Sequence, residues 1–318
     1  MTTATPSVAA PRSSSLRGDR RAELIAGLTL IALPMAFFLI LRIGAILYAV
    51  WISFWRWGLR GPRDMVGLRN YQSLLDDPIF HKAILNSLYY TAIWVPLTMA
   101  LGLFLAIIVN QPIRGRTFFR AAFYFPAIAS SAAITVLWLF IFAPDGLFND
   151  VRTAIGLNPL FQLFGIGPTH NWIGTSNTAM NTIIGLNVWT TSGTFMLFYL
   201  AALQTISKDV YEAAAIDGAG AWQTFRHITF PLLQPAHYFV ATVAVIGGLQ
   251  MFDQAYIGGG PDGNPNNALT TIVLFIYRSA IADVDFGFAA AVGVVLFAII
   301  FTATLIQRRL FGQTPTWV

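Results

Sequence analysis

One twenty-residue segment between two long apolar stretches carries charged and titratable side chains. Residues 212–231 read EAAAIDGAGAWQTFRHITFP and include Glu212, Asp217, Arg226 and His227. An ionised side chain costs roughly 3 kcal/mol at the centre of a bilayer, so this segment is predicted to lie at a membrane surface. There its charged groups can be bound by a peripheral partner, and we expect the chemistry of this segment to be protein recognition.

No other group of residues has the spacing of a catalytic or metal-binding site. The four histidines lie far apart, without the paired spacing of zinc ligands, at His81, His170, His227 and His237. The only lysines, Lys82 and Lys208, do not follow a glycine, so the chain has no GxxxxGKS or GxxxxGKT phosphate-binding loop. The absence of cysteine excludes disulfides and thiolate metal sites. We therefore predict no catalytic residue, no metal site and no directly bound cofactor.

The composition is that of an integral membrane protein. Of the 318 residues, 56% are hydrophobic and only 10% are charged, which is more apolar surface than a globular chain of this size can bury. The predicted fold class is all-α, with membrane-spanning helices in one domain over residues 21–312. Residues 1–20, rich in Ser, Thr, Pro and Ala, are predicted to form a disordered cytoplasmic tail, and residues 313–318 a short C-terminal tail.

Six apolar stretches are long enough to cross a bilayer, which takes about 20 helical residues. They cover residues 24–51, 83–110, 118–142, 179–203, 232–257 and 286–306. Pro96 predicts a kink in the second stretch, and Pro126 with Ser130 and Ser131 is expected to loosen the third. The long segment 144–178 is predicted to be a functional loop. Residues 266–284 are expected to form a re-entrant or surface helix.

The charged segment itself is predicted to contain two short helices. Asp209 is placed to cap the first helix, and Gly218 and Gly220 supply its end and the following turn. Pro231 suits the first turn of the next helix. Helical spacing predicts one apolar face, made of Ile216, Ala219, Trp222, Phe225 and Ile228.

The distribution of basic residues predicts that both termini face the cytoplasm. With the N-terminus inside, the inner segments carry 11 Lys and Arg residues and the outer segments carry 7; Arg42, within the first span, completes the total of 19. Residues 212–231 then also face the cytoplasm. For Arg42 three roles remain open, which are snorkelling to the interface, pairing with an acid of a partner subunit, and contact with an anionic substrate.

Residues 212–231 resemble the EAA signature of ABC importer permeases. The matching positions are Glu212, Ala213, Ala214, Asp217, Gly218, Ala219, Phe225, Ile228 and Pro231. In that family this loop, between spans four and five, forms coupling helices that dock into a cleft of the cytoplasmic ATPase. The resemblance implies that Glu212 orients the ATPase contact, and that Gly218 lets two helices cross where a side chain would clash. Trp222 and Phe225 could equally pack the loop onto its own spans, and a surface helix without a partner is the alternative.

The resemblance covers residues 67–309 and looks like the first permease subunit of carbohydrate-uptake importers, such as the maltose, lactose, glycerol-phosphate and trehalose permeases. It is carried by the runs at 67–91, 115–131, 143–149 and 257–261. It implies a second homologous permease subunit, two ATPase subunits that bind ATP and Mg²⁺, and an extracytoplasmic substrate-binding protein. It also implies a bacterial or archaeal cytoplasmic membrane and alternating access driven by ATP hydrolysis.

Polar and aromatic residues inside the predicted spans are candidates for the substrate path. They are Asn187, Trp189, Thr190 and Thr191 in the fourth span, and Gln250, Asp253 and Tyr256 near the outer end of the fifth. Sugar sites combine aromatic faces with amide and carboxylate groups, so these residue types fit. Small polar residues in spans more often join helices through hydrogen bonds. Asp253 is the stronger indication of a substrate path, because burying a carboxylate in a membrane is costly. The alternative is that Asp253 lies at the interface and faces water.

We therefore predict a six-span permease subunit of an ATP-driven importer for a sugar or related polyol. The first alternative is an importer permease for another small solute, such as an amino acid or peptide. The second is a secondary transporter or channel that works alone, for which inverted repeats should be visible, whereas the sequence shows none. A membrane enzyme has no supporting cluster of residues. Nothing in the sequence identifies the solute.

Overall fold

The computed structural model describes residues 15–112 and 114–311, which fall into two separate units divided after Trp51. The tails predicted at 1–20 and 313–318 lie mostly outside the described residues, and the first helix already begins at Ser15.

The first unit is one long apolar helix. It runs from α1 (Ser15–Phe38) through a π-helical turn, η1 (Leu39–Gly44), into α2 (Ala45–Ile52). The stretch Arg21–Ile52 is long and apolar enough to cross a membrane, and none of its most hydrophobic window is buried by protein. A helix that is apolar all round suits a lipid environment. Arg42 is exposed within η1, so its three possible roles stay open.

The second unit is helical apart from one hairpin. In chain order its elements are β1 (Trp55–Gly58), β2 (Gly61–Met65), α3 (Arg69–Asp76), α4 (Pro78–Asn110), α5 (Arg116–Ile128), α6 (Ser131–Ile141), α7 (Leu147–Ala154), α8 (Asn158–Gln162), α9 (Ser176–Leu203), α10 (Lys208–Ile216), α11 (Ala221–Thr224), η2 (Phe225–Thr229), α12 (Phe230–Leu232), α13 (Gln234–Leu249), α14 (Asp253–Gly259), α15 (Ile272–Tyr277), η3 (Arg278–Ala282) and α16 (Phe286–Phe311).

Among the described residues, five helices are long and apolar enough to span a membrane, or six if the bent pair of α5 and α6 is one span. The two helices of this pair meet at 93°. The bend follows Pro126, which lies inside α5, and falls at Ala129 and Ser130. The predicted loosening of this stretch is therefore confirmed, but as a sharp turn between two helices. By contrast, α4 runs through Pro96 without a break.

The predicted fifth span is also interrupted, which the sequence did not reveal. Residues 250–252 separate α13 from α14, just after Gly247 and Gly248. Glycine lowers helix propensity by about 1 kcal/mol, and a partner outside the helix stabilises the unwound backbone. The Thr271 hydroxyl donates a hydrogen bond to the Met251 carbonyl at 2.8 Å. The break thus leaves the polar backbone groups of residues 250–252 outside a regular helix.

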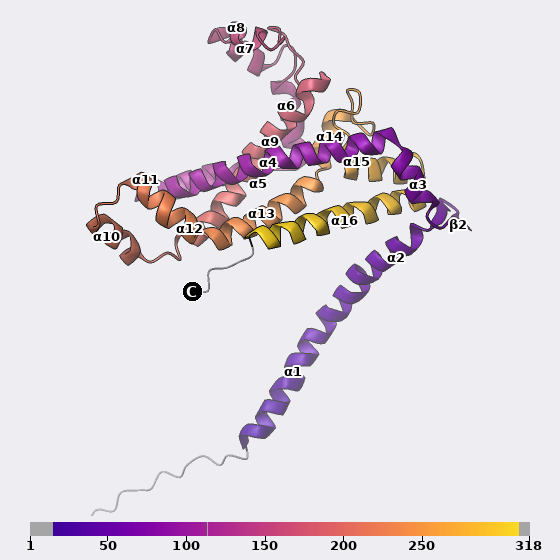
Figure 1. Ribbon diagram of the computed structural model, residues 1–318, viewed down its shortest axis with the longest axis horizontal. Helices are drawn as coiled ribbons and strands as arrows, with labels where there is room; N and C mark the ends of the chain where they lie inside the picture. The colour runs from indigo at the N-terminus through magenta and orange to yellow at the C-terminus, as the bar shows by residue number, and fades with distance from the viewer. Residues whose placement is uncertain (1–14, 113, 312–318) are drawn as a thin grey trace, which may run out of the picture. The chain divides into compact units, whose positions relative to one another are not determined.

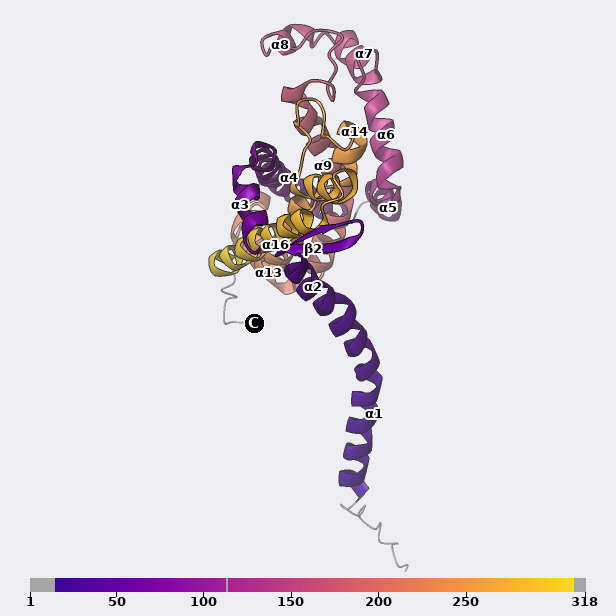
Figure 2. The same ribbon diagram turned by 90° about the vertical axis from the view of Figure 1, so that its right-hand side faces the viewer.

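Helices α4, α9, α5, α13 and α16 pack together as the core of the second unit. α9 packs against α4 and α5, and α13 packs against α4 and α16 (Figures 1 and 2). The ring of Trp94 lies 5.6 Å from that of Tyr90 on α4 and 6.2 Å from that of Phe195 on α9. Small residues let the helices approach closely, which is the usual basis of helix association in membranes.

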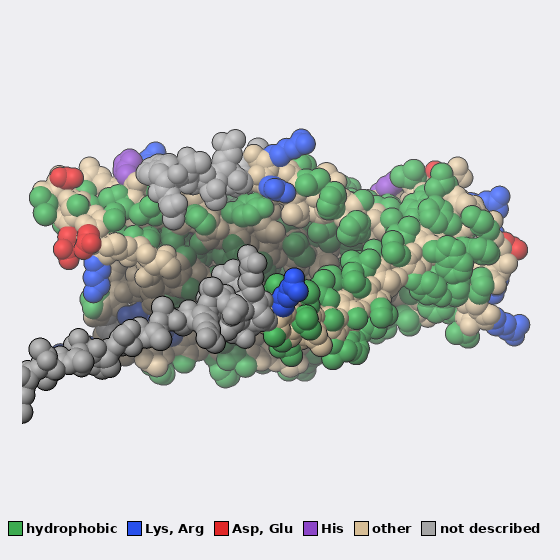
Figure 3. All heavy atoms as spheres, turned by 90° about the horizontal axis from the view of Figure 1, so that it is seen from below, with side chains coloured by type: hydrophobic (Ala, Val, Ile, Leu, Met, Phe, Trp, Pro, Cys, Tyr) green, Lys and Arg blue, Asp and Glu red, His purple; other side chains and the backbone are tan. Residues whose placement is uncertain are grey.

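The two ends of this bundle differ. Figure 1 shows α10, α11 and α12 at one end, and α3 with the β-hairpin at the other, while α7 and α8 lie beyond α6. Figure 3 shows hydrophobic side chains over much of the surface in view. Large hydrophobic residues are exposed on α4 and α16, such as Leu85, Phe104 and Phe297, which suits helices that lipid surrounds.

Short helices and one hairpin occupy the segments between the longer helices. Residues 55–65 form the hairpin of β1 and β2, held by the Asn70 amide, which donates to the Ser53 carbonyl at 2.8 Å and the Trp55 carbonyl at 3.1 Å. The predicted loop at 144–178 contains α7 and α8. The expected helix within 266–284 is found as α15 with η3, an apolar helix too short to count as a span.

Candidate functional site

Residues 212–231 form two short helical pieces joined by a turn, as predicted. α10 ends at Ile216, and Gly218 follows with a φ of +76°, a left-handed conformation that favours glycine. Pro231 lies at the start of α12. The predicted cap is wrong: the Ser207 hydroxyl, rather than Asp209, caps α10 by accepting from the Asp209 amide at 3.3 Å. The chain enters the helix earlier than expected, so Asp209 already lies in the first turn.

The predicted apolar face of this segment is divided. Ala214 is buried, and Ala219, Phe225 and Ile228 are partly buried against the rest of the chain. In contrast, Ile216 is 86% exposed and Trp222 is 68% exposed. The remaining members of the signature are also exposed, and these are Glu212, Ala213, Asp217, Gly218 and Pro231.

The partly buried side chains of the segment lie beside the spans. Ala219 and Phe225 border a cavity of about 470 Å³ that is also lined by Asn110 and Leu203, at the ends of α4 and α9. Phe225 is among the lining residues, so of the two aromatic residues Phe225 packs inward and Trp222 points outward. Gly218 does not lie at a close crossing within this chain, because an added Cβ would meet no heavy atom within 4 Å. The expected clash is therefore wrong, and the positive φ is what requires glycine.

Four of the seven candidate substrate-path residues line one cavity. Asn187 and Thr191 face it from α9, and Gln250 and Asp253 face it from the break between α13 and α14. The cavity has a volume of about 290 Å³. The unwound segment at 250–252 thus brings polar groups from two spans together, as broken helices do in transporters.

The same cavity is lined by two aromatic residues that were not predicted. Tyr90 and Trp94 lie one turn apart on α4, with stacked rings at an angle of 15°. Their i, i+4 spacing in the second predicted span was a signal for a shared aromatic face. Trp94 Nε1 is buried and has no hydrogen-bond partner among the described residues. Such donors are costly unless a ligand or water accepts from them.

The other three candidates lie elsewhere. Thr190 lines a neighbouring cavity of about 150 Å³ beside the bend between α5 and α6. Trp189 stacks on Trp138 of α6, with ring centroids 5.9 Å apart. Tyr256 packs among the aromatic rings of Phe252 and Tyr277. These placements leave Trp189 and Tyr256 outside the polar cavity, although their role in transport stays a prediction.

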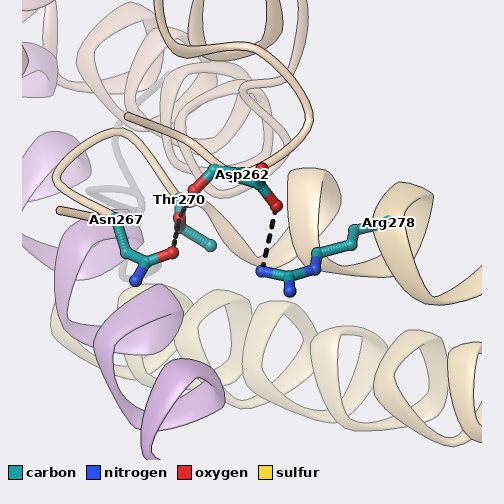
Figure 4. Close-up of polar contacts among 4 residues, drawn as sticks. All are labelled: Asp262, Asn267, Thr270 and Arg278. Carbon is teal, nitrogen blue, oxygen red and sulfur yellow. Dashed lines mark hydrogen bonds and ion pairs between the residues drawn. The ribbon is translucent and has the colours of Figure 1, made fainter. Parts of the chain in front are cut away.

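A folded loop after α14 supports the break. Figure 4 shows Asp262 facing Arg278, with a carboxylate oxygen 3.4 Å from the guanidinium, and Thr270 between Asp262 and Asn267. The Thr270 hydroxyl donates to the Asp262 carbonyl at 3.0 Å. On α4, the Asn86 amide donates to the Asn267 and Thr270 carbonyls, each at 2.9 Å. Because this loop leads directly to Thr271, it fixes the hydroxyl that holds the Met251 carbonyl.

The segment between α6 and α9 has its own polar centre. Arg152 is buried, and its guanidinium lies 5.0 Å from the ring centre of Phe161 and 5.5 Å from that of Trp172. Its Nη2 donates to the Gly167 carbonyl and to the Pro168 carbonyl at 2.8 Å. Burial lowers the pKa of Arg152, but a guanidinium stays charged at neutral pH. This segment is therefore a packed structure.

His170 gives this segment a testable pH dependence. Burial, and to a lesser extent the nearby Arg152, lowers the pKa of His170 below its usual 6.5. The unfolded segment then binds more protons than the folded one, so the free energy of unfolding is constant above pH 6.5 and falls as the pH drops below it. The slope cannot exceed about 1.4 kcal/mol per pH unit, and partial exposure reduces it further.

Limited proteolysis within residues 143–175 measures this effect, because cleavage there follows local opening of the segment that contains His170 and the adjacent Trp172. Thermal or denaturant unfolding at pH 8 and pH 5 should show a less stable segment at pH 5. His170→Gln, which cannot be protonated, should remove most of the difference. A pH dependence that persists in His170→Gln would show that another group causes it.

Taken together, membrane-length helices, a bent helix pair and an interrupted span beside polar cavities, and an exposed helical loop define a polytopic transport protein. The chain belongs to the family described as binding-protein-dependent transport system inner membrane component, which its residues 98–313 match. This membership agrees with the resemblance in the signature segment.

Curated relatives cover most of the chain. It is 34% identical over 256 residues to the arabinooligosaccharides transport system permease protein AraP of Bacillus subtilis, covering 80% of this chain and 79% of the relative. It is 33% identical to the lactose transport system permease protein LacF of Rhizobium radiobacter, covering 76% and 79%. It is also 33% identical to the multiple sugar-binding transport system permease protein MsmF of Streptococcus mutans, covering 89% and 94%.

Solved structures share the fold. A chain of a bacterial alginate ABC transporter, in complex with an alginate pentasaccharide-bound periplasmic protein, matches with a TM-score of 0.77 at 20% identity. The match covers 92% of this chain and 96% of that chain. At this identity the likeness shows the fold alone, which is that of an ABC transporter permease.

Proposed function

We propose that this chain is the permease subunit of an ATP-driven, binding-protein-dependent importer for a sugar or related polyol, and forms half of its translocation path. The sugar assignment is supported by its relatives, which are named as permease proteins of arabinooligosaccharide, lactose and multiple sugar-binding transport systems. In this proposal the bent pair of α5 and α6 is the third of six spans. The N- and C-termini and α10–α12 face the cytoplasm.

Asn187, Thr191, Gln250 and Asp253 are proposed to line the substrate path, together with Tyr90 and Trp94. A sugar offers hydroxyl groups and apolar ring faces, and this cavity offers amides, a carboxylate and two aromatic rings. The unpaired Trp94 Nε1 is a donor that a hydroxyl oxygen of a sugar could satisfy. Delivery would come from an extracytoplasmic binding protein, and a second, homologous permease subunit would complete the path.

The observation that carries the proposal is the exposed part of the signature segment. Ile216 and Trp222 are large, apolar and exposed on a loop that also presents Glu212 and Asp217 to solvent. Apolar anchors ringed by charged groups are typical of protein interfaces. The occupant we propose is an ATPase subunit, one of two that hold ATP and Mg²⁺, because this chain lacks a phosphate-binding loop.

The test is purification of the tagged chain in mild detergent, with identification of what co-purifies. We expect a P-loop ATPase and a second permease. Ile216→Asp should release the ATPase, because it places a charge at an apolar anchor. The matched control is Leu163→Asp, which introduces the same charge in the segment between α6 and α9. Leu163 is 80% exposed, and this variant should keep the ATPase.

Two results would contradict the proposal. If the chain purifies alone and still transports its solute, it is a stand-alone carrier. If both aspartate variants retain the ATPase, α10–α12 is not the docking surface.

A further inference from the structure

Two arginines of α5 converge on one amide group. Arg116 and Arg120 lie one turn apart on this helix, and Gln204 directly follows the end of α9. With its amide oxygen turned toward them, Gln204 Oε1 accepts from an Nη2 atom of each arginine, at 3.0 Å from Arg116 and 3.1 Å from Arg120. Two positive charges are thus held together at a neutral acceptor, although like charges at this spacing repel each other.

No carboxylate compensates these charges. The sequence has no Asp or Glu between Asp77 and Asp145, or between Asp150 and Asp209, so α4, α5 and α9 carry none. Among the described residues the ion pairs are Arg56 with Asp64 and Arg278 with Asp262, and neither involves this cluster.

The hydrogen-bonding capacity of the two arginines is also incompletely used. The Nε atoms of Arg116 and Arg120 are buried and have no partner among the described residues. A guanidinium with free N–H groups binds phosphate through two parallel hydrogen bonds, and a pair of guanidiniums adds charge to that geometry.

We propose that Arg116, Arg120 and Gln204 bind the phosphate of an anionic membrane phospholipid. The membrane is the source that the surroundings favour. Gln204 directly follows α9, a helix long and apolar enough to cross a membrane, so the cluster lies at the depth of the phospholipid headgroups. Bacterial anionic lipids supply the missing negative charge where basic residues meet the membrane surface. The inference rests only on the membrane location of the chain and not on its substrate or its ATPase.

The test measures phosphatidylglycerol binding by the full chain, purified with its subunits, in nanodiscs or by native mass spectrometry. The double variant Arg116→Gln with Arg120→Gln should weaken the apparent affinity for phosphatidylglycerol by about tenfold, since two charged hydrogen-bond donors are lost. The control, Arg308→Gln with Arg309→Gln, removes two exposed arginines of α16 and should change it by less than about twofold. Binding of phosphatidylcholine should not respond to either pair.

Gln204→Glu provides a second variant that does not depend on removing the arginines. It places a carboxylate where both guanidiniums already point, and should raise thermal stability while it weakens lipid binding. Unchanged phosphatidylglycerol binding in both Gln204→Glu and the double arginine variant would overturn the proposal. Loss of a partner subunit from the double variant, with lipid binding unchanged, would assign the site to an acid of that partner. Full displacement of the lipid by excess inorganic phosphate would assign it to free phosphate.

Discussion

Replacing Gly193 with alanine is expected to separate α9 from α5 and to destabilise the folded chain by about 3 kcal/mol, the upper range for overpacking. The added Cβ would overlap the Phe123 carbonyl oxygen and lie 2.9 Å from Tyr124 Cα. Both are backbone atoms of a helix, so no side chain can rotate to relieve the contact. The helices must move apart as bodies.

The functional consequence follows from the neighbours of Gly193. Thr190, Thr191 and Thr194 of α9 line the small cavity beside the bend of α5 and α6. Thr191 also faces the larger polar cavity. Separating α5 from α9 therefore reshapes the proposed path, and we expect transport to be lost even where enough protein folds to be purified.

Gly247→Ala is the matched control, because it adds the same methyl group in α13 where no heavy atom lies within 4 Å. It should be neutral or stabilising by up to about 1 kcal/mol, the difference in helix propensity. Unfolding in detergent with increasing SDS compares the two variants. Equal stability of Gly193→Ala and Gly247→Ala would show that α5 and α9 are not in the described contact.

The helices and their positions could largely be predicted, because long apolar stretches leave few alternatives in a membrane. The bend between α5 and α6 could be predicted from the sequence, whereas the interruption between α13 and α14 could not. The bend at Ser130 was signalled by Pro126, which removes one backbone hydrogen bond and so weakens the end of α5. The break at residues 250–252 has no proline, and it depends on the Thr271 hydroxyl, twenty residues away, which no local pattern reveals.

In the site, too, some features have a local sequence signal and others depend on tertiary packing. The types and approximate depths of Asn187 and Gln250 could be predicted, since polar residues in spans are unusual. Which of them meet depends on how α9 rotates against α13, and this is set by packing. Trp189, on the same stretch as Asn187, faces Trp138 instead. Tyr90 and Trp94 were missed because aromatic residues are equally at home in an apolar core.

The segment α10–α12 has both packed and exposed residues, which suits the two proposed roles of contacting the spans and docking the ATPase. Phe225 and Ala219 border the cavity next to the ends of α4 and α9, which is where the proposed coupling would reach those spans. Ile216 and Trp222 face outward for the proposed ATPase. A coupling element needs both faces, and in this chain they belong to different residues.

The largest effect of a single polar substitution is expected at Asn149, in the segment between α6 and α9. Its Nδ2 lies within hydrogen-bonding distance of three carbonyl oxygens, those of Ala143 at 3.1 Å, Pro144 at 2.9 Å and His170 at 2.9 Å. Its Oδ1 accepts from Trp172 Nε1 at 2.9 Å. The side chain is only 3% exposed, so water cannot replace these partners.

Asn149→Asp should therefore unfold this segment while the helix bundle remains intact. The carboxylate keeps the acceptor for Trp172 but loses both N–H donors, and it places a negative charge beside three carbonyl oxygens. Each buried group left without a partner costs about 1 to 3 kcal/mol, so the total loss is about 3 to 5 kcal/mol. Limited proteolysis within residues 143–175 and the near-ultraviolet circular dichroism of Trp172 report it.

Asn158→Ala is the control for this substitution, since it removes one hydrogen bond to the Thr153 hydroxyl at the surface of the same segment. It should change stability by less than about 0.5 kcal/mol. If the segment is a docking platform for the proposed binding protein, only Asn149→Asp should lower transport stimulated by that protein. A protease-resistant Asn149→Asp segment would mean that Arg152 and the aromatic rings around it, rather than Asn149, hold this part of the chain together.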